Sequence, residues 1–314
     1  MSANDLNQIK GNYWITCNEK YVVLRGKKLY VFRHDGSLVW RRADLKNVWK
    51  VSFLPDDRLL TDGGNTYRIL SLADGRDIWC YRQGKSESKS DSFAISPDRS
   101  FAFDICDWMD QYRVVRIDLR CLCAEEFKVP SRLRVIKDAL CDDAGSLNIL
   151  QTQYDQKVDG QVSTNGVLCW DQRAREEKEP FTWKDQWEFD GRRISRFFLG
   201  DTETILTNDL HVFHRKTQKM YYLLENDINT HLPRSPLQYG IDLSGKYVTL
   251  MYDNENVVID WQRRKVVARY AGEGTQGCLI GNHFWISSEN GVQRKPFPLM
   301  EEALPQKYIF WKPY

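Results

Sequence analysis

A cluster of turn-forming residues between two short apolar runs recurs along this chain of 314 residues. The segment "SFAISPDRSFAF" (92–103) shows the pattern, with Ser-Pro-Asp at its centre and alternating apolar residues on both sides. Pro, Gly, Asp and Asn suit such turns because they preset or tolerate the turn dihedral angles. Seven segments share the pattern: "TCNEKYVV" (16–23), "FLPDDRLL" (53–60), "ISPDRSFAF" (95–103), "LCDDAGSLNIL" (140–150), "FLGDTETIL" (198–206), "DLSGKYVTL" (242–250) and "LIGNHFWI" (279–286). Their spacing is about 40 to 45 residues, with one interval of about 58, and this periodicity predicts a repeated structural unit.

A second turn follows the first one in most of these repeats, after about 16 to 22 residues. Examples are "HDGS" (34–37), "ADGR" (73–76) and "DLRC" (118–121). The segments around these turns favour β-strands, because they are rich in β-branched and aromatic residues. Two hairpin turns per repeat therefore predict four antiparallel strands per repeat. Since no segment shows an apolar stripe at the helical period, we expect almost no helix.

Four strands in a repeat of this length are typical of one blade of a β-propeller, which buries its faces against neighbouring blades. The segment "FAISPDRSFAF" (93–103) resembles the inner-strand hairpin of WD40 repeats, and "VLCWDQ" (167–172) has a Trp-Asp pair where WD40 proteins place theirs. The segment "SLADGRDIWCY" (71–81) is similar to a hairpin of quinoprotein-type repeats. This resemblance to divergent β-propellers implies an all-β fold, a seven-bladed β-propeller of four-stranded antiparallel blades. We expect a single domain, 1–314, with blades near 13–45, 46–83, 91–129, 133–183, 192–226, 236–271 and 275–314.

The overall charge is nearly balanced, with 45 Lys and Arg residues against 43 Asp and Glu residues. A general polyanion binder would concentrate an excess of basic residues on one face, so we expect no nucleic-acid partner. No apolar run reaches the roughly 18 residues that a membrane helix needs, so we expect no membrane contact. The first residues lack the basic and apolar segments of a secretory signal, and we therefore expect a cytoplasmic protein.

The chain has eight cysteines, and most of them lie in apolar, strand-like runs. The members of this group are Cys17, Cys80, Cys106, Cys169 and Cys278. We interpret them as buried, reduced thiols, because a free cysteine in a core behaves as a small hydrophobic residue. Cys121 and Cys123 form the one close pair, but no second Cys or His pair stands at the spacing of a zinc site. We therefore expect no metal ion and no cofactor.

No motif in the sequence indicates catalysis: a P-loop, a Gly-x-Ser-x-Gly elbow and a dinucleotide fingerprint are all missing. His211 and His214 stand three positions apart in a predicted strand, so they point to opposite faces and cannot chelate one ion. Two function classes stay open. The first is a non-catalytic scaffold that binds a protein or peptide, and the second is a redox or hydrolytic enzyme of the quinoprotein-like or lactonase-like propeller type.

The long connections of the predicted propeller gather on one face. In a propeller, the second-to-third strand connections and the connections between blades open on the same face, which we call the long-loop face; long loops on a rigid scaffold commonly carry binding residues. Aromatic residues and arginines dominate the energetics of protein interfaces. The predicted partner-binding residues on this face are Trp108, Met109, Tyr154, Trp187, Arg192, Arg193 and Arg234. The alternative is that each loop tryptophan folds back to form a small core under its own loop.

Overall fold

The computed structural model consists of short antiparallel β-sheets, and the residues that it describes contain no α-helix. It describes residues 6, 9–11, 13–45, 47–63, 65–84, 87–88, 93–108, 111–128, 134–141, 145–154, 163–170, 182–186, 197–200, 204–207, 210–214, 217, 219–224, 232, 238–241, 247–252, 255–260, 263–271, 277–280, 282–288 and 291–297. The chain divides into two compact units, and each is described by itself. The first unit consists of residues 1–80, 223–308 and 314, and the second consists of residues 81–222 and 309–313.

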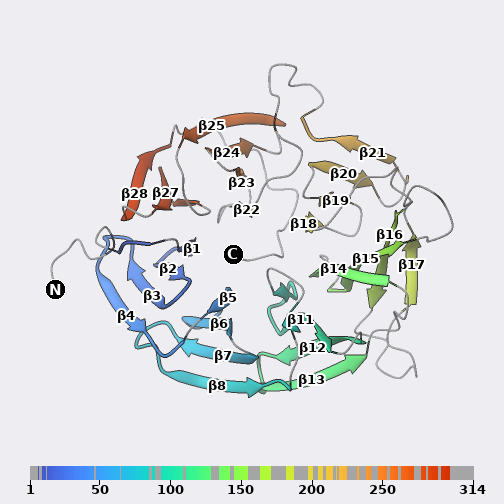
Figure 1. Cartoon of the computed structure of the whole chain (residues 1–314), viewed down its shortest axis with the longest axis horizontal. Coiled ribbons are helices and arrows are strands. Elements are labelled where there is room, and N and C mark those ends of the chain that lie inside the picture. The colour runs from blue at the N-terminus through green and yellow to red at the C-terminus, as the bar shows by residue number, and fades with distance from the viewer. Residues whose placement is uncertain are drawn as a thin grey trace. The chain divides into compact units, whose positions relative to one another are not determined.

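The sheets of the first unit are built from strands that follow one another in sequence (Figure 1). One sheet has the order β1 (Trp14–Cys17), β2 (Tyr21–Arg25), β3 (Leu29–Arg33), β4 (Leu38–Arg42). The next has the order β5 (Val48–Leu54), β6 (Arg58–Gly63), β7 (Thr66–Ser71), β8 (Asp77–Arg82). The last residues of β8 belong to the second unit. Two further sheets are β22 (Gln238–Ile241), β23 (Tyr247–Met251), β24 (Glu255–Asp260), β25 (Lys265–Ala271), and β26 (Cys278–Ile280), β27 (His283–Ser288), β28 (Gly291–Pro296).

The second unit repeats the same arrangement. Its first sheet has the order β10 (Ala94–Ile95), β11 (Phe101–Trp108), β12 (Gln111–Asp118), β13 (Cys123–Lys128), and the short β9 (Glu87–Ser88) also pairs with β11. The other two sheets are β14 (Arg134–Cys141), β15 (Leu147–Tyr154), β16 (Ser163–Trp170), β17 (Thr182–Gln186), and β18 (Phe197–Gly200), β19 (Thr204–Thr207), β20 (His211–His214), β21 (Lys219–Tyr222). Neighbouring strands with a defined register run antiparallel in both units, as the paired turns predict.

One backbone hydrogen bond recurs in three of the sheets and ties their two hairpin turns together. The donor is the residue directly after the third strand, and the acceptor is the carbonyl directly before the second strand. The three pairs, each at 2.8 Å, are Leu72 to Asp57, Leu119 to Ser100 and Phe297 to Asn282. All three donor residues are buried. The repeat that the sequence shows only as turn spacing is therefore present as a shared hydrogen bond.

The "SPDRS" turn is held by the side chain of Asp98. Asp98 Oδ1 accepts hydrogen bonds from the hydroxyls of Ser96 and Ser100, both at 2.7 Å, and from the backbone N–H of Ser100 at 3.1 Å. Ser96 Oγ in turn accepts the backbone N–H of Phe101 at 2.9 Å. Arg99 adopts a left-handed conformation with φ of 54°. An acidic residue after proline is useful here because its carboxylate accepts the backbone N–H of Ser100 and orients the two serine hydroxyls.

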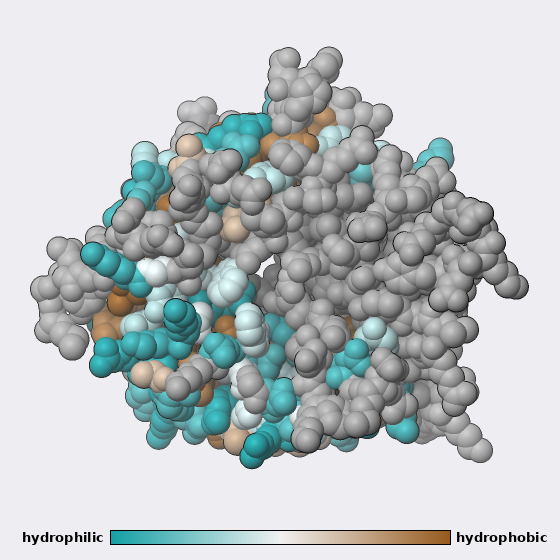
Figure 2. Space-filling view, in the orientation of Figure 1, coloured by the Kyte–Doolittle hydropathy of each residue, from teal (hydrophilic) through white to brown (hydrophobic). Residues whose placement is uncertain are grey.

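Burial decreases from the first to the last strand of a sheet. In β5 every residue but Trp49 is buried, whereas β8 is largely exposed and includes Ile78, which is 40% exposed. On the face shown in Figure 2, the described residues are mainly hydrophilic, and the apolar areas among them are small and separate. In the described residues, the inner strands are therefore mostly buried between neighbouring sheets, and exposure is greatest on outer strands such as β8.

Apolar side chains from neighbouring sheets form the core of the first unit. Between the β1–β4 and β5–β8 sheets, Val23, Val31 and Trp40 pack with Val51, Phe53, Leu59, Leu70 and Leu72. The indole N–H of Trp40 donates to the carbonyl of Leu72 at 2.8 Å. This bond satisfies the polar end of a buried aromatic residue, as burial of tryptophan requires.

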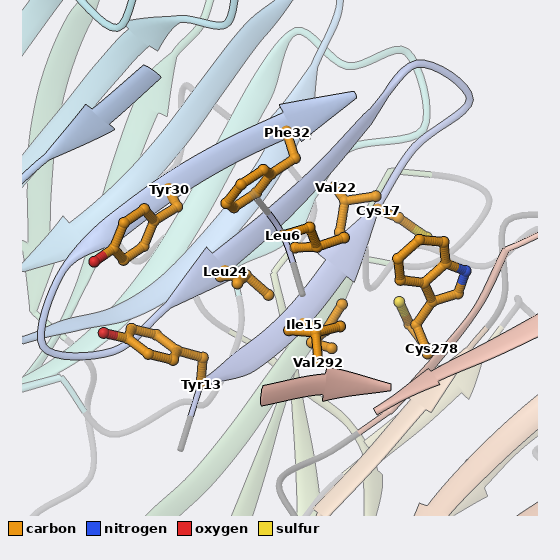
Figure 3. Close-up of a cluster of buried hydrophobic side chains, with 11 residues drawn as sticks. Leu6, Tyr13, Ile15, Cys17, Val22, Leu24, Tyr30, Phe32, Cys278 and Val292 are labelled. Atoms are coloured by element: carbon orange, nitrogen blue, oxygen red, sulfur yellow. The ribbon is translucent and has the colours of Figure 1, made fainter. Parts of the chain in front are cut away.

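A second cluster joins sheets from opposite ends of the sequence. Strand β1 lies against β26 and β27, and side chains of both sheets meet there (Figure 3). Ile15 and Cys17 pack with Cys278, Trp285 and Val292. These contacts make residues about 260 positions apart part of one core, which only a chain that returns to its beginning can achieve.

Candidate binding surface

The β1–β4 sheet lines up charged and aromatic residues along one of its edges. Four residues lie side by side across this sheet: Trp14 pairs with Arg25, Arg25 pairs with Leu29, and Leu29 pairs with Arg42. Strands β1 and β3 begin at this edge, and β2 and β4 end there. The connections that leave it, β2–β3 and β4–β5, are of the kind that the sequence assigned to the long-loop face. We call the residues of this edge, together with the start of β5, the loop edge.

Trp49 is the most exposed large apolar residue of the described part of the chain. The pairing of β5 with β6 shifts register between Val48 and Lys50, so that Trp49 is the extra residue of a β-bulge. The residue is 58% exposed, while both of its neighbours are buried. Bulges re-aim a side chain away from the sheet, and a large apolar side chain that is held in solvent indicates a contact surface.

Arg25 connects Trp49 to a second tryptophan. The guanidinium carbon of Arg25 lies 5.0 Å from the ring centroid of Trp14, which is the geometry of a cation–π contact. Arg25 Nη1 also donates a hydrogen bond to the backbone carbonyl of Trp49. Arg25, at the end of β2, is therefore held between the starts of β1 and β5. Because its side chain is already ordered, it loses less conformational entropy when a partner binds.

Further basic side chains surround the two tryptophans. Lys27 and Lys28 in the β2–β3 turn and Arg41 at the end of β4 are exposed, and none of them forms an ion pair with any residue that the structure describes. Three cations are thus available to a partner at the loop edge.

Arg42 differs from these cations, because its charge is already compensated. It bonds to Asp44 at 2.7 Å, to Asp77 at 2.9 Å and to the carbonyl of Gly75 at 2.8 Å. The hydrogen bond to Asp44 raises the pKa of Arg42, burial opposes it, and the bond to Asp77 raises it further. The hydrogen bond from Arg42 in turn lowers the pKa of Asp44. Arg42 therefore serves to position the β4–β5 connection.

Two of the predicted partner-binding residues lie at strand ends of the second unit. Trp108 is the last residue of β11 and pairs with Gln111, and Tyr154 is the last residue of β15 and pairs with Ser163. Both therefore stand at the second-to-third strand hairpin of their sheets, where the sequence placed them. The other predicted residues, Met109, Trp187, Arg192, Arg193 and Arg234, lie outside the described residues. Their role as one binding surface stays a prediction.

The sequence interpretation missed Trp49, because "VWKVSFL" (48–54) reads as an ordinary buried strand. In a regular strand Trp49 would share a face with Val51 and Phe53, which are buried. The bulge turns Trp49 away from that buried face. The sequence did not reveal this because a bulge has no unique sequence signature. The one available signal is Lys50, a charged residue within an otherwise apolar inner strand.

The cysteines follow the prediction only in part. Cys17, Cys106 and Cys278 are buried free thiols, as predicted. The prediction is wrong for Cys80, which is exposed because alternate residues of the outer strand β8 face solvent. Cys121 and Cys123, which lie outside the group predicted to be buried and reduced, are joined as a disulfide. The side chain of Cys169 lies outside the described residues.

Three smaller findings concern a candidate metal site, the two histidines and membranes. Within the described ranges, the ligand atoms of Asp118, Cys121 and Cys123 lie within 4.8 Å of one another, a separation that could hold a metal ion. His211 and His214 contact Tyr222 and Tyr221, at centroid distances of 5.4 and 5.6 Å. The part of the chain that the structure describes has no helix of the length and apolarity needed to cross a membrane.

Four-stranded antiparallel sheets in sequence order, with joined hairpin turns, define the class of fold: the chain has the fold of a β-propeller. Many solved structures resemble it. One is the crystal structure of the Myceliophteria thermophila Cps50 (Swd1) β-propeller domain, with a TM-score of 0.65 and 13% sequence identity, covering 93% of this chain and 98% of that domain. The predicted β-propeller is thereby confirmed at the level of the fold. No family model matches the sequence, and no curated protein matches it.

Proposed function

We propose that the protein is a non-catalytic, cytoplasmic scaffold, a single domain of seven blades that binds an acidic segment of a protein or peptide on its long-loop face. The observation that carries this proposal is Trp49, which a β-bulge holds 58% exposed beside Arg25. Tryptophan and arginine are the residues that most often dominate the energetics of protein interfaces.

The charge of the loop edge sets the chemistry of the partner. Lys27, Lys28 and Arg41 are exposed at this edge without ion pairs to described residues. A segment with Asp or Glu side chains next to an apolar one would complement both the cations and Trp49. The balanced charge of the whole chain favours such a local contact over nucleic acid, which would require a broader excess of basic residues.

The test is binding of defined peptides to the full chain. Fluorescent peptides of equal length and equal apolar content carry either glutamates or lysines, and fluorescence anisotropy measures their affinity at low and high salt. We expect the acidic peptides to bind, and we expect their affinity to fall with salt because exposed charges are screened. Trp49→Ala should weaken binding at least about tenfold.

Ile78→Ala is the matched control, since Ile78 is an exposed apolar residue on the outer strand β8. It should leave the affinity unchanged. Equal binding of acidic and basic peptides, or equal losses for the two variants, would contradict the proposal. If a single-stranded oligonucleotide binds more tightly than the acidic peptides, and if this binding depends on Trp49, then the partner is a nucleic acid and not a peptide.

A further inference from the structure

A left-handed residue recurs in the turn between the third and fourth strands of several sheets. One residue of this turn is left-handed: Gly36 with φ of 88° in the β3–β4 turn, Gly75 with 73° in the β7–β8 turn and Leu122 with 55° in the β12–β13 turn. Leucine rarely adopts this conformation, which glycine adopts without strain. The hairpin geometry therefore determines the backbone at Leu122.

The two side chains that flank the left-handed residue meet in each of these turns. Ser37 Oγ donates to Asp35 Oδ1 at 2.6 Å across Gly36. Arg76 Nε lies 3.4 Å from Asp74 Oδ2 across Gly75. The equivalent positions around Leu122 are Cys121 and Cys123, whose sulfur atoms are bonded. In these three turns the two flanking side chains therefore lie close to each other.

The thiols at these positions are accessible, and their backbone is held in place. Both Cys121 and Cys123 are exposed. Asp118 Oδ1 accepts the backbone N–H groups of Arg120 at 2.9 Å and of Cys121 at 3.1 Å, so the turn is fixed by bonds that do not involve sulfur. A reduced pair would stay in contact, and closing its disulfide requires little rearrangement of the chain.

We propose that Cys121 and Cys123 form a reversible dithiol–disulfide site that exchanges with small-molecule thiols of the glutathione class. The thiolate of one glutathione attacks one sulfur of the disulfide, and the other cysteine leaves as a thiolate that takes up a proton. A second glutathione thiolate then displaces the remaining cysteine, and oxidised glutathione is released. The protein gains two electrons and two protons, which two glutathione thiols supply. Exposed disulfides are the ones that exchange readily in this way.

The experiment equilibrates the full chain with mixtures of reduced and oxidised glutathione, quenches it with acid, alkylates the free thiols and locates them by peptide mass spectrometry. We expect Cys121 and Cys123 to become protected together, as an internal disulfide without bound glutathione. Cys80 is the internal comparison, because it is exposed but has no partner cysteine among the described residues. It should instead acquire glutathione as a mixed disulfide.

Two variants separate a paired site from two independent thiols. In Cys123→Ser, Cys121 should behave as Cys80 does and acquire one glutathione. Leu122→Gly should keep the internal disulfide, because glycine accepts the left-handed conformation. The proposal is overturned if Cys121 and Cys123 each acquire glutathione in the wild type, or if both stay reduced while Cys80 reacts. Protection that requires zinc and disappears with a chelator would also overturn it, in favour of a metal site with Asp118.

Discussion

The backbone N–H of Tyr13 donates to Ser287 Oγ at 3.3 Å, although 274 positions separate the two residues in sequence. The same hydroxyl donates to the carbonyl of Gly11 at 3.1 Å, and Ser287 is fully buried. One serine therefore satisfies two backbone groups of the segment that leads into β1. This link adds to the packing of β1 on β26 and β27.

Ser287→Ala should lower the free energy of unfolding by about 1 to 3 kcal/mol, because it removes the hydroxyl that bonds to the N–H of the buried Tyr13 and to the partly buried carbonyl of Gly11. Ser52→Ala is the matched control: Ser52 is equally buried, but its hydroxyl has no partner among the described residues. Its removal should be neutral or stabilising. Urea denaturation of both variants measures the difference, and equal losses would contradict the role of Ser287.

Gly277 lies where a side chain has no room. A Cβ at this position would stand 2.3 Å from Cζ of Phe284 and 2.8 Å from the carbonyl oxygen of Trp285. Gly277→Ala should therefore destabilise the fold by about 1 to 3 kcal/mol through overpacking. Gly84→Ala, where nothing lies within 4 Å, should have little effect. Thermal denaturation compares the two, and a Gly277→Ala variant as stable as Gly84→Ala would show that Phe284 can move aside.

The turn spacing predicted the sheets because a hairpin turn is a local feature of sequence. The positions of side chains between sheets could not be predicted in the same way. Cys17 and Cys278 meet only because β1 packs on β26, and this contact has no local signal. Trp49 was missed for a related reason, since a bulge reverses the face on which a residue lies without changing its neighbours in sequence. The binding candidates at Trp108 and Tyr154 were identified from loop length, which is visible in sequence.

Tyr81 should titrate at unusually high pH. Its hydroxyl donates to Glu126 Oε1 at 2.9 Å. Burial, this hydrogen bond and the charge of Glu126 raise the pKa of Tyr81 to about 12. Glu126→Gln should lower that pKa towards its ordinary value near 10. Tyrosinate absorbance during an alkaline titration measures it, and Tyr81→Phe identifies the signal.

The same shift affects alkaline stability. Since the folded state holds the phenol proton more tightly than the unfolded state, the contribution of Tyr81 is fully present below about pH 10 and is lost as the pH rises towards 12. The free energy of unfolding of Tyr81→Phe should therefore decline less steeply over this range. Parallel slopes for the two proteins would contradict the assignment.

Asp98 should make the fold sensitive to acid. Burial acts to raise its pKa, but the hydrogen bonds from Ser100 and Ser96 outweigh burial and hold the pKa below its ordinary value. A lowered carboxyl pKa stabilises the fold above the unfolded pKa near 4, and that stabilisation is lost as the pH falls through the folded value. Wild type should therefore be more stable than Asp98→Ala at neutral pH, and the difference should shrink in acid. Urea denaturation at pH 7 and pH 3 measures it, and a constant difference would show that the carboxylate charge is irrelevant.

The predicted loop tryptophans can be tested by partner capture. Trp108→Ala combined with Trp187→Ala should leave the protein folded and remove the partners that wild type captures, because these side chains are expected to contact them. Circular dichroism checks the fold. If the double variant unfolds, the tryptophans belong to the core. If Arg263→Ala, in a short turn on the opposite face, abolishes capture, the binding surface was assigned to the wrong face.

The hydrogen bond that joins the two turns of a sheet is donated by backbone, from Leu72, Leu119 and Phe297. Any amino acid except proline can supply that donor, so the bond imposes no residue signature beyond an apolar side chain that can be buried. Repeats held in this way can drift apart in sequence while each keeps the same hairpin geometry. Mutations then accumulate freely in the opposite connections, and new binding specificity can evolve there without a redesign of the blade.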